Sequence, residues 1–322
     1  MHAIQITQTG GPEVLSLVEL PVPVPGPDQV LIKVAATGVN FIETYYREGR
    51  YPATLPLVLG EECAGTVEQL GPDVEGFAVG DRVATRAALG SYAEYALVPA
   101  AKLVPVPDGL DLKTAAAVFL QGMTAHYLVF ATWVLEAGET ALVHAAAGGV
   151  GLLLTQMASA LGARVIATVS TPEKAELARQ AGAHEVILYT ESDFEEETRR
   201  LTNGRGVDVV YDSVGKTTFE KSLKCLRPRG LLALFGGSSG AVPPFDLIKL
   251  STMGSLFVTR PTLKDYIATR AELEERASAV FNWVLEGKLK VRCEHTYPLA
   301  DAAQAQIDIA SRKTTGKLLL IP

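Results

Sequence analysis

The spacing of apolar and polar residues changes along the chain, and its first part is typical of short β-strands. Glycine and proline separate β-prone runs that recur through residues 1–110. We expect strands at 3–8, 14–20, 30–36, 63–70, 82–85 and 92–98, with one aromatic-rich helix at 40–48. This spacing fits a small barrel or distorted sheet better than a parallel α/β sheet.

From Asp111 onward, helix-like and strand-like segments alternate. Helices are expected at 112–120, 124–135, 149–161, 172–180, 193–201 and 217–225. Strands are expected at 141–144, 164–169, 185–189, 207–211 and 231–235. The alternation predicts an α/β fold with a doubly wound parallel sheet.

The last segment is less regular. It predicts a helix at 263–285, a strand at 290–297, a helix at 300–311 and a final strand at 317–321. We expect this tail to return to the β-rich part. That gives a first part at 1–123, an inserted domain at 124–260 and a return at 261–322.

Composition narrows the function classes. The 322 residues suffice for about two domains. A net charge of -7 and a pI near 5.4 argue against general attraction to nucleic acids or anionic membranes. The three cysteines and five histidines show neither a disulfide framework nor paired metal-ligand spacing. No apolar run approaches the ~20 residues of a membrane span and no signal peptide is recognised, so we expect a cytoplasmic protein.

A turn rich in small residues follows the strand at 141–144. Its pattern is Ala146-x-Gly148-x-x-Gly151, where a dinucleotide-binding fingerprint has G-x-G-x-x-G. Small residues permit a tight turn, close approach of backbone N–H groups to a pyrophosphate, and close packing of helix on strand. The alternative is a crowded strand-to-helix junction that selects small residues without binding a ligand.

The end of the next strand distinguishes the two nicotinamide cofactors. An acidic side chain about 20 residues after the turn would bind the ribose of NADH, and we find none there. Ser170, Lys174 and Tyr189 can instead donate to a 2′-phosphate, which favours NADPH. The alternative is a helix cap followed by a solvated lysine.

Several segments together resemble one family. They are HAAAGGVG at 144–151, NFIETYYREGRYP at 40–52, GEECAG at 60–65, QGMTA at 121–125, YDSVG at 211–215, FGGSSG at 235–240, FVTRP at 257–261 and TTGKLLLIP at 314–322. This combination closely resembles the quinone oxidoreductases, the zeta-crystallin-like branch of the medium-chain dehydrogenase/reductase superfamily. The resemblance spans essentially the whole chain. It implies a GroES-like catalytic domain built from both chain ends, a Rossmann domain between them, and a homodimer.

The resemblance also assigns roles to individual residues. Gly148, Gly149, Val150 and Gly151 would bind the pyrophosphate, and Arg312 would join Ser170, Lys174 and Tyr189 at the 2′-phosphate. Thr124, Phe235, Gly236 and Ser238 would border the nicotinamide half, and Ser213 would close over the adenosine side. Asn40, Tyr45 and Tyr51 would face the substrate. Plain alternatives are strand core for Phe235, a simple turn for Gly236, and aromatic packing for both tyrosines.

One departure from the zinc alcohol dehydrogenases of the superfamily bears on the chemistry. Those enzymes have a G-H-E motif where this chain has Gly60-Glu61-Glu62, and many carry a four-cysteine lobe that this chain lacks. Without the histidine ligand, oxidation through a metal alkoxide loses its Lewis acid. We therefore expect a reductase that uses no metal, with Cys63 as a core residue.

The predicted activity is transfer of reducing equivalents from NADPH to a quinone. Asn40 and Tyr45 are expected to hydrogen-bond a quinone oxygen, with protons from solvent or a tyrosine. Some family members form semiquinones, so one-electron and two-electron transfer both stay open. Two alternatives remain: NADPH-dependent reduction of activated alkenes such as 2-alkenals, and an NADPH-binding structural or RNA-binding protein without turnover.

Overall fold

The computed structural model describes residues 1–88 and 90–322, which form two compact units. The terminal unit combines Met1–Gln121 with Ile267–Pro322, and the central unit is Gly122–Tyr266. The inserted-domain fold class is confirmed, because a doubly wound sheet lies between two segments that fold together.

The central unit contains a parallel six-stranded sheet in the order β11-β10-β9-β12-β13-β14. Its strands are β9 (Thr140–His144), β10 (Arg164–Val169), β11 (Glu185–Leu188), β12 (Val207–Asp212), β13 (Leu226–Leu234) and β14 (Phe257–Thr259). Counted from β9, this is the 3-2-1-4-5-6 order of a Rossmann fold. The strand order therefore reverses between β9 and β12, where such folds bind their ligands.

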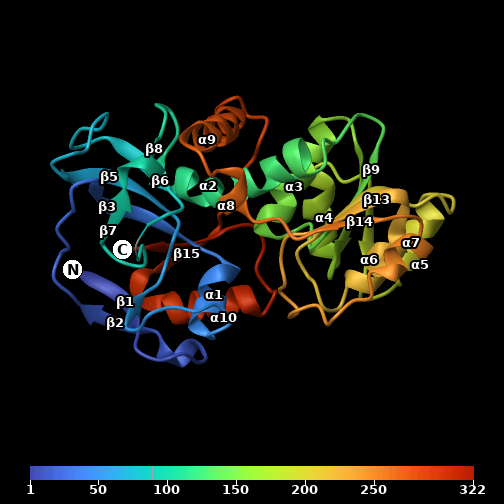
Figure 1. Ribbon diagram of the computed structural model, residues 1–322, viewed down its shortest axis with the longest axis horizontal. Coiled ribbons are helices and arrows are strands. Elements are labelled where there is room, and N and C mark those ends of the chain that lie inside the picture. Colours follow the sequence, from blue (N-terminus) through green and yellow to red (C-terminus); the bar gives the residue numbers. More distant parts are fainter. Residues whose placement is uncertain (89) are drawn as a thin grey trace. The chain divides into compact units, whose positions relative to one another are not determined.

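Helices cover both faces of this sheet (Figure 1). They are α3 (Gly149–Ala160), α4 (Pro172–Gln180), α5 (Phe194–Leu201) and α6 (Phe219–Cys225), with α7 (Ile248–Thr252) and α8 (Leu263–Tyr266) after them. The helix α3 packs beside α4, and α5 packs beside α6. The core between sheet and helices is apolar and includes Leu142, Ile166, Val210 and Phe219.

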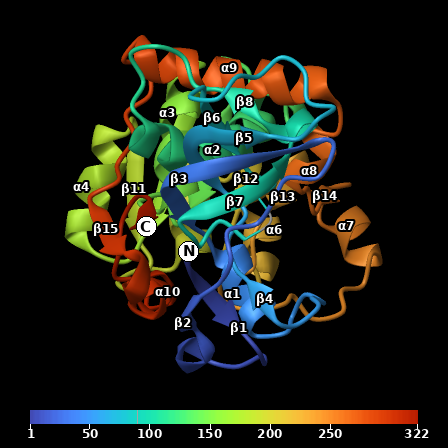
Figure 2. The same cartoon turned by 90° about the vertical axis from the view of Figure 1, so that its left-hand side faces the viewer.

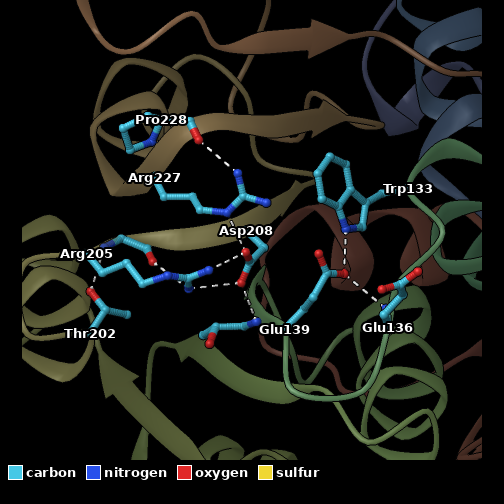
Figure 3. A network of polar contacts seen from close by, with 10 residues as sticks. Trp133, Glu136, Glu139, Thr202, Arg205, Asp208, Arg227 and Pro228 are labelled. Atoms are coloured by element: carbon cyan, nitrogen blue, oxygen red, sulfur yellow. Dashed lines mark hydrogen bonds and ion pairs between the residues drawn. The ribbon is translucent and has the colours of Figure 1, made fainter.

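A buried carboxylate fastens the amino ends of the central strands (Figure 3). Asp208 accepts hydrogen bonds from the backbone of Thr140 at 2.7 Å and from Arg205 at 2.7 Å, and Arg227 lies 2.5 Å from it. The Arg227 guanidinium also stacks 5.9 Å from the Trp133 ring. This network lies at the opposite strand ends from the glycine turn.

The terminal unit is β-rich. Its larger sheet has the order β15-β16-β3-β5-β6-β8, with β7 also paired to β3, and its smaller sheet has the order β2-β1-β4. The strands are β1 (His2–Ile6), β2 (Ser16–Glu19), β3 (Gln29–Val39), β4 (Leu57–Val58), β5 (Cys63–Leu70), β6 (Arg82–Thr85), β7 (Tyr95–Pro99), β8 (Val104–Pro105), β15 (His295–Pro298) and β16 (Leu318–Ile321). The C-terminal strand β16 pairs antiparallel with β3, with Leu319 opposite Gly38.

Three α-helices that belong wholly to this unit lie around these sheets (Figure 2). They are α1 (Phe41–Arg47), α9 (Arg270–Leu285) and α10 (Ala302–Ala310), with short 3₁₀ turns η1 (Pro12–Val14), η2 (Ala100–Lys102) and η4 (Leu299–Asp301). The helix α10 packs against α1 and β16, while α9 packs against β8. Ile4, Val39, Tyr92 and Leu318 are among the buried residues under α10.

Two helix predictions were wrong. The expected helices at 112–120 and 124–135 are one helix, α2 (Leu112–Tyr127), followed by a π-helical turn at Leu128–Thr132. The expected helix at 263–285 is broken, because Thr269 and Glu272 form a capping box that begins α9 afresh.

The expectation that no apolar run approaches the length of a membrane span was also wrong. The stretch Leu112–Thr132 is long and apolar enough to cross a membrane by length and composition. However, 78% of its most apolar window is buried inside the structure, as in the core helix of a globular protein.

Candidate functional site

The glycine turn joins β9 to α3 at the point where the strand order reverses. Gly148 is the N-cap of α3 with an extended backbone, and no side chain caps the helix among the described residues. The first N–H groups of a helix have no partner within the helix, and they carry its partial positive charge. The turn at Gly148, Gly149, Val150 and Gly151 therefore has the form of an anion site for a pyrophosphate.

The packing of this turn shows why its residues are small. A Cβ at Gly151 would overlap the carbonyl oxygen of Ala145 and lie 2.8 Å from Ala146 Cα. Ala145 itself adopts a φ of 51°, so the backbone folds back on the helix start. At Gly148 the same carbonyl oxygen would lie 3.2 Å from a Cβ. The turn thus fits a dinucleotide, because its small residues leave the backbone uncovered at the start of α3.

Three of the predicted phosphate-binding residues emerge at neighbouring strand ends. Ser170 follows β10 and Tyr189 follows β11, which pairs in parallel with β10. Lys174 is in the first turn of α4, where its backbone N–H donates to the Thr171 cap at 3.3 Å. The structure therefore brings Ser170, Lys174 and Tyr189 to one edge of the sheet.

Sequence reasoning overlooked an acidic residue in the same turn of α4. Glu173 lies beside Lys174, and hydrogen bonds from its own backbone N–H and from Thr171 lower the pKa of its carboxyl group. The carboxylate is therefore already engaged at the helix start. Its position, two residues before α4 completes its first turn, was visible in the sequence but was not considered.

A second polar cluster shapes the loops after β12 and β13. Asp212, which is fully buried, accepts hydrogen bonds from the backbone of Val214 at 2.7 Å and of Gly215 at 3.0 Å. The other carboxylate oxygen accepts from Thr218 at 2.7 Å and Ser222 at 3.0 Å. These contacts fix the loop at 213–215. The YDSVG segment contained this aspartate, but no role was assigned to it.

The predicted residues of these two loops lie together. The backbone N–H of Ser238 donates to Ser213 O at 3.1 Å, and that of Phe235 donates to Asp212 O at 2.9 Å. A Cβ at Gly236 would lie 2.8 Å from Ser213 Cα. The structure therefore brings Ser213, Phe235, Gly236 and Ser238 to adjacent strand ends, although Ser213 was expected on the adenosine side and the other three at the nicotinamide half.

A buried histidine links this loop to the glycine turn. His144, the last residue of β9, lies 2.9 Å from Thr168 Oγ1 and 3.0 Å from Ser222 Oγ. Burial lowers the pKa of His144 against an opposing effect of the Asp212 charge, which favours the neutral imidazole. Ser222 in turn bonds Asp212, which ties β9, β10 and β12 together beneath the turn.

Thr124 and Arg312 lie far along the sequence from the other predicted cofactor-binding residues. Thr124 is a buried residue of α2 in the central unit. Arg312 follows α10 in the terminal unit and adopts a φ of 59°. Their roles at the nicotinamide half and at the 2′-phosphate stay predictions.

The three predicted substrate residues belong to α1 and the loop after it. Asn40 is the N-cap of α1 and forms a capping box with Glu43. Tyr51 packs edge-on against Tyr45 and against Tyr46, each at 5.6 Å between ring centroids. The tyrosines are therefore in contact with each other, while Asn40 lies at the opposite end of α1.

Asn40 is held by two buried charges that sequence reasoning did not assign to a site. Lys317 Nζ donates to Asn40 Oδ1 at 2.6 Å, and Asn40 Nδ2 donates to Glu62 Oε2 at 3.0 Å. Lys317 and Glu62 also form an ion pair at 2.5 Å, with 1% and 0% of their side chains exposed. The signal for this cluster was present only as charged residues inside two of the resembling segments.

Glu43 adds a buried carboxyl group next to this cluster. Burial, reinforced by the negative charge of Glu61, raises the pKa of Glu43 to about 8 against a partly opposing effect of Lys317. Glu43 Oε2 accepts a hydrogen bond from the Asn40 backbone at 2.8 Å, which holds the carboxyl group at the start of its own helix, α1. With this raised pKa, the Glu43 carboxyl group is mostly protonated and uncharged near pH 7.

The chemistry around Glu61 does not suit a catalytic zinc. Its carboxylate is bound by Arg86 at 2.6 Å. Burial, with a smaller effect of Glu62, raises the pKa of the neighbouring Cys63 thiol to about 12, which keeps it protonated and a poor ligand. Within residues 1–88 and 90–322, no three His, Cys, Asp or Glu side chains are grouped to hold a metal ion.

Comparisons with known proteins cover both units. A family model described as an alcohol dehydrogenase GroES-like domain matches residues 26–108, which confirms the expected GroES-like domain. A model described as a zinc-binding dehydrogenase matches residues 149–283. This match does not include Glu61, the position at which the chain departs from the zinc alcohol dehydrogenases.

Relatives that match over the full length of the chain point to a more specific family than the two domain models do. The quinone oxidoreductase of Pseudomonas aeruginosa is 49% identical over 321 residues, which is 99% of each chain. The 2-haloacrylate reductase of a Burkholderia species is 45% identical over 328 residues, covering 99% of this chain and 98% of the relative. The crystal structure of Escherichia coli quinone oxidoreductase complexed with NADPH superposes with a TM-score of 0.98 at 45% identity, covering all of both chains.

Proposed function

Because this chain belongs to the quinone oxidoreductase family of the medium-chain dehydrogenase/reductase superfamily, we propose that it is an NADPH:quinone oxidoreductase that works without a metal. The observation that carries the proposal is the bare glycine turn at the switch point of the central sheet. A turn with this packing suits a dinucleotide, and the full-length relatives of the chain include a quinone oxidoreductase and a 2-haloacrylate reductase.

The central unit supplies all the cofactor-binding groups except Arg312, which belongs to the terminal unit. Backbone N–H groups of Gly148, Gly149, Val150 and Gly151 bind the pyrophosphate, because they point from a helix start at which charge is favourable. Ser170, Lys174 and Tyr189 donate hydrogen bonds to the 2′-phosphate, and Arg312 adds a positive charge. Thr124, Phe235, Gly236 and Ser238 border the nicotinamide half, and Ser213 closes the adenosine side.

The terminal unit supplies the groups for the acceptor. When bound, NADPH supplies the reducing equivalents. Asn40 and Tyr45 donate hydrogen bonds to the quinone oxygen on which negative charge develops, and Tyr51 packs on Tyr45 to limit its movement. Protons come from solvent or from a tyrosine, so no strong internal base is required.

The metal-free character rests on Glu61. A carboxylate that is already paired with Arg86 occupies the position of the zinc-binding histidine. Metal analysis of purified active protein should therefore give much less than one zinc per chain, and activity should survive chelator treatment. Stoichiometric zinc that is needed for turnover would contradict this part of the proposal.

A second activity is favoured by one specific relative. The similarity to a 2-haloacrylate reductase indicates that an acceptor pocket of this kind can hold an activated alkene. Benzoquinones, naphthoquinones and 2-alkenals should be compared side by side with NADPH. We expect the quinones to give the higher kcat/KM; reduction of 2-alkenals alone would replace the first proposal with the second.

We also propose a cytoplasmic homodimer. The strand β14 is the outermost strand of the central sheet and exposes Phe257 and Val258. An exposed apolar sheet edge is a favourable surface for pairing with another chain. Light scattering should give twice the mass of one chain, and Val258→Lys should shift it toward the monomer.

A further inference from the structure

The buried ion pair of the terminal unit is an unusual feature for a small β-rich domain. Lys317 precedes β16, and Glu62 precedes β5, and neither side chain is exposed to solvent. Burying a charge is costly, and a buried pair adds little stability compared with apolar residues of the same volume. Stability alone therefore gives a weak reason for this pair.

The two charged groups that contact the Asn40 amide have opposite hydrogen-bonding character. An ammonium group can only donate hydrogen bonds, and a carboxylate can only accept them. Lys317 Nζ lies 2.6 Å from Asn40 Oδ1, and Glu62 Oε2 lies 3.0 Å from Asn40 Nδ2. A flipped amide would place N–H groups against the ammonium and the carbonyl oxygen against the carboxylate. Only one orientation of the amide satisfies both neighbours.

Further contacts prevent the pair itself from rotating. The second oxygen of Glu62 accepts a hydrogen bond from the Leu120 backbone at 2.6 Å. A Cβ at Gly38 would overlap the Glu62 carboxylate and lie 2.7 Å from Lys317 Nζ, so the backbone of β3 lies directly against both groups. Gln121 also presents its Nε2 to Asn40 Oδ1, at 3.5 Å. All these partners impose the same orientation on the amide.

We propose that Lys317 and Glu62 are positioning residues that lock the Asn40 side chain so that one N–H remains directed to the carbonyl oxygen of the acceptor. The amide nitrogen carries two hydrogens, and Glu62 takes only one of them. This inference rests on the proposed function, because it gives the remaining N–H its role toward a quinone. Lys317 and Glu62 contact Asn40 and not the acceptor, so they act through it.

An oriented donor stabilises developing charge without having to reorganise. Such a contribution exists mainly in the transition state, so its loss lowers kcat and leaves KM nearly unchanged. Misplacement of a catalytic group by about 1 Å costs about 10²-fold in rate. We expect a loss of about that size when the two charges are removed together.

The first experiment uses the double variant Lys317→Met/Glu62→Gln, which leaves no unpaired buried charge. We expect a Tm close to that of the wild type, an unchanged Kd for NADPH measured by fluorescence, and a kcat for benzoquinone about 10²-fold lower. In an Asn40→Ala background, the same two substitutions should lower kcat no further, because there is no amide to orient. Equal losses in both backgrounds would overturn the proposal.

A matched control breaks a buried charge pair elsewhere. Asp208→Asn weakens the contacts with Arg205 and Arg227 in the central unit (Figure 3). It should lower Tm and leave kcat for benzoquinone within about twofold of the wild type. A loss of kcat as large as that of the double variant would mean that kcat follows stability, and it would overturn the positioning role.

A direct observation keeps the proposal testable if the double variant fails to fold. In a neutron structure of the wild-type protein exchanged into D₂O, Asn40 Nδ2 should direct one of its two deuterons toward Glu62, and Oδ1 should face Lys317. The opposite orientation, or a mixture, overturns the proposal. This result is independent of activity: a wild-type protein that reduces no quinone contradicts the proposed function, whereas the amide orientation tests the lock itself.

Discussion

The glycine turn of the central unit and the Asn40 cluster of the terminal unit are built by opposite means. The turn at 148–151 presents backbone N–H groups of consecutive residues, and its packing leaves no room for a Cβ at Gly151. The cluster uses side chains from positions 40, 62 and 317, all buried and all constrained by charge. The glycine turn depends on the small size of its residues, and the Asn40 cluster depends on buried charges that fix the hydrogen bonds.

This difference predicts different vulnerabilities. Added volume should damage the turn, since its backbone lies within contact distance of the helix start. The Asn40 cluster should tolerate little change in charge or protonation, since each buried polar group depends on its partner.

Gly151→Val should nearly abolish cofactor use. A Cβ there overlaps the Ala145 carbonyl oxygen, so α3 must move away from the turn and misplace the N–H groups for the pyrophosphate. We expect kcat/KM for NADPH to fall by at least about 10²-fold. Gly148→Ala is the matched variant in the same turn, since its Cβ would lie 3.2 Å from that oxygen. Equal losses for the two variants would contradict the steric account.

Glu43→Gln should change how stability depends on pH. The folded-state pKa of Glu43 is raised to about 8, above the ordinary value of 4.5, so its stabilising effect is complete below pH 4.5 and is lost as pH rises through 8. Between these values the wild type should lose about 1.4 kcal/mol of unfolding free energy per pH unit relative to the variant.

Urea titrations of both proteins at several pH values measure this difference. The glutamine keeps the volume of Glu43 and an oxygen that can accept from the Asn40 backbone, so the capping box is retained. Parallel stability curves for the two proteins would show that Glu43 is not held neutral by its buried position.

Lys174→Ala should weaken NADPH binding about 10-fold and NADH binding much less, because only NADPH presents a 2′-phosphate to the ammonium group. Titration calorimetry with both cofactors gives the two Kd values. Arg179→Ala on the same helix, where Arg179 pairs with Glu176, is the matched loss of positive charge. If Lys174→Ala weakens both cofactors equally, Lys174 does not bind the phosphate.

Tyr51→Phe should have the smallest effect, about a threefold loss of kcat/KM for quinones. The ring packs on Tyr45 and Tyr46 and would still do so without its hydroxyl group. Tyr51→Ala should cost more, because it removes that packing. If Tyr51→Phe were as damaging as Tyr51→Ala, the hydroxyl group would have a direct role that packing does not explain.

The contrast between the two sites also explains what the sequence could predict. The glycine turn is local: a strand, small residues and a helix follow each other in one stretch, so the pattern can be recognised. The strands β5, β6 and β10 were predicted with the bounds that the structure has, because proline, glycine and apolar spacing are local as well.

The rest depends on contacts between distant residues. Lys317 and Glu62 are 255 positions apart, and only the antiparallel pairing of β16 with β3 brings the lysine beside Asn40. Asp212 likewise acts on a loop through its carboxylate, which no periodic pattern reveals. The break between α8 and α9 was missed because the apolar spacing continues across it, while the capping box at Thr269 begins a new helix there.

The most direct test of the account is the steady-state kcat/KM of the purified wild-type protein for reduction of 1,4-benzoquinone, measured with NADPH and with NADH in parallel. The account predicts quinone-dependent oxidation of NADPH, with kcat/KM at least about 10-fold higher than for NADH, since a phosphate-binding group contributes about that factor. No quinone-dependent oxidation of either cofactor would contradict it.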